Sequence, residues 1–169
     1  MRYRAKLTVK EIERLIYPVS FFRNKAEHVK ACCEMLLSRF GGRVPGTMDE
    51  LVSLPGVGRK TANLVLILAF KSQQNICVDI HVHRISNRLG WVKTTMPEET
   101  EQALYRATDQ RWWPLINLYL VTWGQNVCRP VRPRCGDCRG ACAPQTVRGS
   151  PVSALGSALE RARHQRRAN

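Results

Sequence analysis

Two short segments of this sequence carry residues suited to chemistry on a sugar–phosphate chain. Residues 54–62 read Leu-Pro-Gly-Val-Gly-Arg-Lys-Thr-Ala, and residues 78–81 read Val-Asp-Ile-His. The glycines permit a tight turn, and a helix that begins directly after such a turn points its first backbone N–H groups at one phosphate. The amine of Lys60 stands at that helix start, and the carboxylate of Asp79 begins the next helix. A deprotonated amine is a nucleophile, and a carboxylate stabilises positive charge that develops on a sugar.

Each of these residues also has a simpler interpretation. The turn could be a plain connection between packed helices, Lys60 a phosphate contact, and Asp79 an ordinary N-cap. We favour a helix-hairpin-helix phosphate grip because the chain carries a net charge of +14, and such a grip holds the DNA backbone rather than reading its sequence. The helix N-terminus and Arg59 both disfavour a charged Lys60 amine. The predicted DNA-contacting residues are Leu54, Pro55, Gly56, Val57, Gly58, Arg59, Thr61 and His81.

Four cysteines form the second group with chemical potential. Cys128, Cys135, Cys138 and Cys142 lie within 15 residues, among arginines and prolines. A loop this polar does not bury four free thiols, so the cysteines are expected to bind a metal. Their spacing alone fits an iron–sulfur cluster or a four-thiolate zinc site equally well. The other three, Cys32, Cys33 and Cys77, are interpreted as core residues.

The overall composition narrows the class of partner. The chain has 169 residues, 44% of them hydrophobic, and an isoelectric point near 10.1. A field this positive attracts polyanions, of which nucleic acid is the first candidate and an anionic membrane surface the second. No segment is apolar for long enough to span a bilayer, and no secretory signal begins the chain. Seven cysteines without such a signal indicate a reducing compartment.

The elements that must position these residues are all predicted to be helices. Helices are expected over residues 25–40, from 48, over 59–70 as a buried central helix, from the Asp79 cap to 89, after Thr95, and over 112–123. Residues 144–169 are expected to be a basic flexible tail. The predicted N-caps, each with its Glu partner, are Thr8 with Glu11, Asn24 with Glu27, Thr47 with Glu50, and Thr95 with Glu98.

Residues 54–66, residues 78–85 and the cysteine cluster together resemble the endonuclease III family of DNA glycosylases, within the helix-hairpin-helix superfamily. The resemblance covers about residues 9–144. It implies that Lys60 attacks the sugar C1′, expels a damaged base as a Schiff base forms, and cleaves the abasic strand by β-elimination, with Asp79 assisting. Oxidised pyrimidines are the implied substrate, and double-stranded DNA with damaged bases or abasic sites is the implied partner. The damaged base must leave the stack to react.

The resemblance also implies a four-iron–four-sulfur ([4Fe-4S]) cluster rather than zinc. The family spaces its cysteines C-x6-C-x2-C-x5-C, whereas this chain has three residues in the last gap. The implied layout is part of a helical barrel over residues 1–77, a helical domain ending in the cluster loop over 78–145, and the tail over 146–169. The family begins several helices before Met1, so the chain is interpreted as N-terminally truncated, either because its true start lies upstream or because it is a fragment.

The remaining expectations concern the whole molecule. A monomer is expected if the full-length chain exists. The expected location is the cytoplasm beside the nucleoid of a bacterium, or the nucleus or mitochondrion of a eukaryote. Two rival interpretations stay open: a DNA-binding module that keeps the grip without catalysis, and a zinc-stabilised interaction protein.

Overall fold

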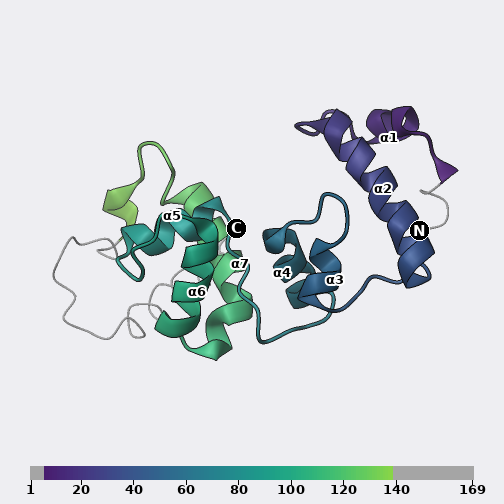
Figure 1. The fold of residues 1–169 in the computed structure, drawn as a ribbon. Coiled ribbons are helices and arrows are strands. Elements are labelled where there is room, and N and C mark those ends of the chain that lie inside the picture. Colours follow the sequence, from purple (N-terminus) through teal and green to yellow (C-terminus); the bar gives the residue numbers. More distant parts are fainter. Residues whose placement is uncertain (1–5, 139–169) are drawn as a thin grey trace. The chain divides into compact units, whose positions relative to one another are not determined.

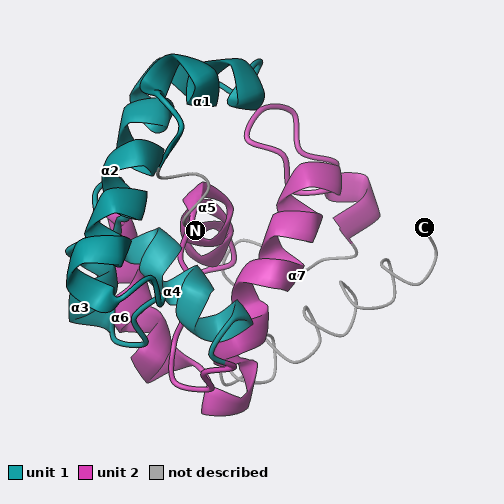
Figure 2. Ribbon diagram, turned by 90° about the vertical axis from the view of Figure 1, so that its right-hand side faces the viewer, with its two compact units in different colours: residues 1–70 teal, residues 71–169 magenta. Residues whose placement is uncertain are grey.

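Every regular element between residues 6 and 138 is helical in the computed structural model, which describes those residues (Figure 1). The expected all-α class is therefore confirmed. The chain divides into two compact units, residues 1–70 and 71–169 (Figure 2). The expected domain boundary followed residue 77, and the expected tail, residues 146–169, lies outside the described residues. No helix between residues 6 and 138 is long and apolar enough to cross a membrane.

Between residues 6 and 70, the α-helices of the first unit are α1 (Val9–Ile16), α2 (Phe22–Phe40), α3 (Met48–Val52) and α4 (Arg59–Leu68). Two of the predicted caps are confirmed. The Oγ1 atom of Thr8 accepts the N–H of Glu11 at 3.3 Å, and Thr47 does the same for Glu50 at 3.4 Å. These caps fix where α1 and α3 begin. The core of the unit is built from Leu36, Leu51, Leu54, Ala62 and Leu66.

Two predictions for the first unit are wrong. Helix α2 begins at Phe22, so Asn24 lies inside its first turn, and the N-cap is Phe21 in the left-handed conformation at φ 57°. The carbonyl of Phe21 accepts the Lys25 N–H at 3.0 Å, which starts the helix before Asn24 can cap it. Helix α4 was expected to run to residue 70 and to be buried on most sides. It ends at Leu68, whose side chain is 60% exposed.

The second unit holds α5 (Ile80–Arg88), α6 (Pro97–Ala107), the 3-10 turn η2 (Gln110–Trp112), α7 (Trp113–Asn126) and the 3-10 turn η3 (Cys135–Cys138). Helix α7 ends three residues beyond the expected Trp123. The core of the second unit is formed by residues from α5, α6 and α7 and from the segments next to them. These are Ile76, Val78, Val82, Ile85, Trp91, Leu104, Ile116, Tyr119, Leu120, Trp123, Val127, Cys128 and Cys138.

The start of α6 corrects a third cap prediction. Its N-cap is Met96 rather than Thr95, and its partner is Glu99 rather than Glu98. The Glu99 carboxylate accepts the backbone N–H groups of Thr95 at 3.0 Å and Met96 at 3.2 Å. Both glutamates favour a helix N-terminus electrostatically, but only Glu99 occupies the position that reaches back to the cap. The cap of α5 is Asp79, as predicted.

Candidate functional site

The turn between α3 and α4 is a helix-hairpin-helix in form. Leu54 is 4% exposed and anchors the turn in the core of the first unit. The Val57 N–H donates to the Leu54 carbonyl at 3.1 Å, which closes the turn. Gly56 has φ +75°, and a Cβ placed on it would come within 2.7 Å of the His28 Cβ. Only glycine therefore fits at position 56, because both the conformation and the space exclude a side chain.

Lys60 is the second residue of α4 and its side chain is exposed. The helix begins immediately after Gly58, whose carbonyl accepts the first intrahelical hydrogen bond, from Ala62 N–H, at 3.0 Å. No acidic residue lies in the first turn of α4. The positive end of the helix, Arg59 and Lys60 thus form one electropositive surface at the turn, of the kind that binds phosphate. Thr61 is exposed on the same turn.

Asp79 is held firmly in place at the start of α5. Its Oδ1 atom accepts the N–H groups of His81 and Val82, both at 2.9 Å. These two hydrogen bonds hold the carboxylate in a fixed position at the helix start. The side chain is half-buried, and the next residue, Ile80, is 72% exposed. Asp79 therefore caps α5, as its simpler interpretation predicted. This capping role does not conflict with the proposed catalytic role.

His81 lies deeper than the sequence suggested. Its ring is half-buried against Gly124 of α7, where a Cβ would collide with it, and its Nδ1 atom lies 3.2 Å from Nη2 of Arg84. Arg84 also donates to the Cys128 carbonyl at 2.9 Å. A packing role for His81, which the sequence left open, is therefore realised here. Its contact with DNA stays a prediction.

Three of the four predicted metal-binding cysteines lie in the described residues. Cys128 and Cys138 are buried in the core of the second unit, and Cys135 is exposed. Cys135 and Cys138 are the two ends of η3, and side chains three apart in a 3-10 turn lie on the same side. Cys142 lies outside the described residues. Within residues 6–138, no three or more His, Cys, Asp or Glu side chains are arranged as a metal site.

Arg88 positions the start of the cysteine loop. It donates to the carbonyls of Arg129 at 2.7 Å and Pro130 at 3.0 Å, and its Nη1 atom lies 3.5 Å from the Cys128 sulfur. The two backbone hydrogen bonds fix the chain directly after Cys128, at the start of the loop. The described cysteines supply three sulfur donors, the chemistry that an iron–sulfur or zinc centre requires, but they are not gathered into a metal site within residues 6–138.

One surface feature escaped the sequence reasoning. The end of α1 and its connection to α2 expose a group of large apolar side chains: Leu15 at 72%, Tyr17 at 68%, Val19 at 46% and Phe21 at 82%. Phe21 stands in the left-handed conformation, which is strained for a bulky residue and often marks a functional position. The available signal was a cluster of aromatic residues beside Arg23 and Lys25.

Comparison with known proteins identifies the superfamily to which this chain belongs. Residues 4–110 match the family model described as HhH-GPD superfamily base excision DNA repair protein. This match covers more than half of the chain, so the chain belongs to that superfamily. Within it, the expected similarity to endonuclease III is confirmed by both sequence and structure.

Among curated proteins, the chain is 50% identical over 134 residues to Endonuclease III homolog 2, chloroplastic, of Arabidopsis thaliana, covering 75% of this chain and 35% of the relative. It is 47% identical over 134 residues to Endonuclease III of Thermotoga maritima, covering 79% of this chain and 62% of the relative. The chain thus spans between about a third and just under two thirds of the length of these relatives.

Solved structures show the same relationship. A non-covalent endonuclease III–DNA complex matches with a TM-score of 0.76 and 35% identity, over 81% of this chain and 64% of that one. A trapped endonuclease III–DNA covalent intermediate matches with a TM-score of 0.75 and 35% identity, over 80% and 63%. A thermostable thymine-DNA glycosylase matches with a TM-score of 0.69 and 26% identity, over 81% and 64%.

Proposed function

We propose that this chain acts in base-excision repair as a bifunctional DNA glycosylase and abasic-site lyase. The observation that carries this proposal is the exposed Lys60 on the first turn of α4, directly behind a Gly56 turn that admits no side chain. An amine in this position lies beside a phosphate-binding helix terminus, within reach of a bound sugar. A trapped covalent intermediate of a structural relative with DNA supports a covalent route.

The proposed reaction begins at the amine of Lys60. Its deprotonated Nζ attacks C1′, the glycosidic C1′–N bond breaks, and the base leaves with the bonding electrons. Loss of a proton and opening of the sugar ring give a Schiff base between Nζ and C1′. Removal of a C2′ proton then expels the 3′ phosphate by β-elimination, which cleaves the strand. The fixed carboxylate of Asp79 is assigned to stabilise the positive charge that develops on the sugar.

We assign DNA binding to the turn between α3 and α4 and to the positive net charge of the chain. Residues 54–59 and Thr61 would hold a backbone phosphate, and His81 would contribute a weaker contact. The net charge of +14 would supply affinity that does not depend on sequence. Oxidised pyrimidines in duplex DNA are the proposed substrate. The compartment is expected to be the one that holds the DNA: bacterial cytoplasm, or a eukaryotic nucleus or mitochondrion.

We assign the exposed apolar side chains around Phe21 to contact with the opened DNA duplex. Removing a base from the stack leaves a gap, and glycosylases must compensate for the lost stacking. Apolar side chains inserted between base steps perform this role in proteins that distort DNA. Phe21 is 82% exposed, and the Arg23 guanidinium lies over the ring of the neighbouring Phe22, 5.2 Å from its centroid, so this connection combines aromatic rings with a positive charge.

A [4Fe-4S] cluster is the proposed cofactor, with zinc as the alternative. Cys128, Cys135 and Cys138 would hold it together with Cys142. When bound, the cluster would link the loop into one structural unit. Arg88 would fix the first ligand through its bonds to residues 128–130. A brown preparation with broad visible absorption supports iron, whereas a colourless protein that contains zinc contradicts it.

A cleavage assay on end-labelled duplex tests the function. The substrate contains one ring-saturated, oxidised thymine, and the control duplex contains thymine. We expect strand breaks in the damaged duplex without alkali, and no additional breaks after alkali treatment. Tight binding of both duplexes without base release would instead identify a DNA-binding module. Breaks that appear only after alkali would contradict the lyase step.

A further inference from the structure

The segment that leads into helix α5 is buried although it belongs to no regular element. Residues 69–78 connect α4 to Asp79, the cap of α5. The last three of them, Ile76, Cys77 and Val78, are only 0%, 0% and 5% exposed. A buried backbone N–H that has no helix or sheet partner must bond to another group. The group that bonds to this segment therefore helps to fix the position of Asp79.

The hydroxyl of Tyr105, on α6, makes one of these bonds. Its oxygen accepts the Ile76 N–H at 3.1 Å, between residues 29 positions apart in the sequence. The same hydroxyl donates to Oε1 of Glu101 at 3.5 Å, one turn earlier on α6, where the glutamate is only 3% exposed. The bond from Ile76 thus ties the chain to α6 three residues before Asp79.

The ring of Tyr105 is itself held in place by α7. It meets the ring of Trp113 edge to face, with 4.7 Å between the ring centroids and 80° between the planes. The Nε1–H group of Trp113 donates to the carbonyl of Thr108 at 3.3 Å and to its Oγ1 atom at 3.2 Å. A side chain that its neighbours lock in one orientation can hold another group with the precision that catalysis requires.

We propose that Tyr105 is a positioning residue for Asp79 in base release, acting through its hydrogen bond to the Ile76 N–H. The inference rests on the proposed function, in which Asp79 stabilises positive charge on the sugar. The N–H groups of His81 and Val82 orient the carboxylate on α5, and the Tyr105 bond fixes the chain that enters this cap. A misplacement of about 1 Å can lower a rate on the order of 100-fold, so a hydroxyl that acts only through Asp79 affects the reaction.

Tyr105→Phe tests the proposal because it removes the hydroxyl and keeps the ring against Trp113. The matched control is Tyr119→Phe, because Tyr119 is a buried tyrosine of α7 without a hydrogen bond from its hydroxyl to the described residues. Single-turnover base release and duplex affinity are measured with the full 169-residue chain. Tyr105→Phe should lower the rate of base release about tenfold and leave the Kd for damaged duplex within about twofold. Tyr119→Phe should change neither.

A double-mutant cycle separates positioning of Asp79 from a general weakening of the fold. In an Asp79→Asn background, Tyr105→Phe should lower base release by less than about a further twofold, because the group that it positions is already gone. The same tenfold loss in both backgrounds would overturn the proposal. So would undiminished base release in Tyr105→Phe, or an equal loss in Tyr119→Phe.

Amide hydrogen exchange, followed by NMR, gives a readout that does not need activity. The Ile76 amide should be protected in wild type, and the Ile76, His81 and Val82 amides should all exchange faster in Tyr105→Phe. An unprotected Ile76 amide in wild type would overturn the proposal, even where Tyr105→Phe does not fold. If wild type releases no base, the proposed function fails. Faster exchange at His81 and Val82 would then still support the positioning of Asp79, and unchanged exchange there would overturn it.

Discussion

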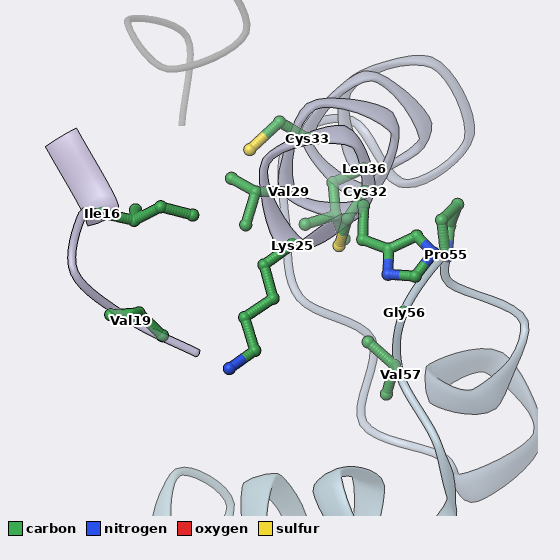
Figure 3. Close-up of a pocket in the computed structure, with 11 residues that line it drawn as sticks. Ile16, Val19, Lys25, Val29, Cys32, Cys33, Leu36, Pro55, Gly56 and Val57 are labelled. Atoms are coloured by element: carbon green, nitrogen blue, oxygen red, sulfur yellow. The ribbon is translucent and has the colours of Figure 1, made fainter. Parts of the chain in front are cut away.

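The α-carbon of Gly56, in the turn between α3 and α4, lies directly against the side chain of His28 in α2 (Figure 3). A Cβ on Gly56 would approach the His28 Cβ to 2.7 Å, and the residue also requires φ +75°. Gly56→Ala should therefore lower the free energy of unfolding by about 2–4 kcal/mol, from left-handed strain and from overpacking together. Denaturant unfolding measures the loss.

Gly58 provides the matched control. It has no neighbour within 4 Å of an added Cβ, and its φ of −92° suits any residue. Gly58→Ala should change the free energy of unfolding by less than about 1 kcal/mol. Equal destabilisation by the two substitutions would show that the packing against His28 is not what excludes a side chain at position 56.

Asp79 combines a capping role with its proposed catalytic charge, and two substitutions separate them. Asp79→Asn keeps an acceptor for the His81 and Val82 N–H groups, so stability should stay within about 0.5 kcal/mol. Asp79→Ala should lose about 0.5–2 kcal/mol. Base release should fall on the order of 100-fold in both. Full activity in a stable Asp79→Asn protein would leave Asp79 as a cap only.

Glu99 gives a pH-dependent prediction for helix α6. Backbone hydrogen bonds from Thr95 and Met96 lower the pKa of its carboxyl below the ordinary value of 4.5. A lowered folded pKa means that its stabilisation is complete above pH 4.5 and is lost as the pH falls through the folded value. Glu99→Gln should therefore lower the melting temperature near neutral pH and reduce its decline in acid.

The neighbouring Glu98 is the control for that experiment. It is exposed and forms no side-chain hydrogen bond or ion pair in the described part of the chain. Glu98→Gln should reproduce the wild-type acid profile in a thermal melt monitored by circular dichroism. Matching profiles for Glu99→Gln and wild type would contradict the assignment of the cap to Glu99.

Substitutions of Phe21 should separate its effect on protein stability from its effect on binding to distorted DNA. Asn tolerates the left-handed conformation better than Phe, so Phe21→Asn should keep the free energy of unfolding or raise it by up to about 1 kcal/mol. If the ring stacks in the opened duplex, the same change should weaken binding to damaged DNA about tenfold. Phe21→Tyr should retain binding. Undiminished affinity of a folded Phe21→Asn protein would remove Phe21 from the interface.

Much of the helix-hairpin-helix could be predicted from sequence, because the residues that determine its turn and helix ends lie close together in the chain. The glycines, the capping residues Thr8, Thr47 and Asp79, and the helix start at Arg59 depend on neighbours within a few positions. The cap of α2 could not be predicted, since Asn24 is a better capping residue than Phe21, whereas the helix starts where the Lys25 N–H bonds to the Phe21 carbonyl. The half-burial of His81 was equally hidden, because it depends on Gly124 in a distant helix. The nucleophilic role of Lys60 and the iron–sulfur assignment of the four cysteines came from resemblance and stay predictions.

Covalent trapping with borohydride tests the central claim most directly. Reduction during reaction with abasic duplex should convert the Schiff base into a stable bond, and peptide mapping should locate the adduct on Lys60. Lys60→Gln and Lys60→Arg should form no adduct, and Lys60→Arg should still bind the duplex because its charge remains. An adduct on another residue, or no adduct from folded wild-type protein that binds abasic DNA, would contradict the proposed mechanism.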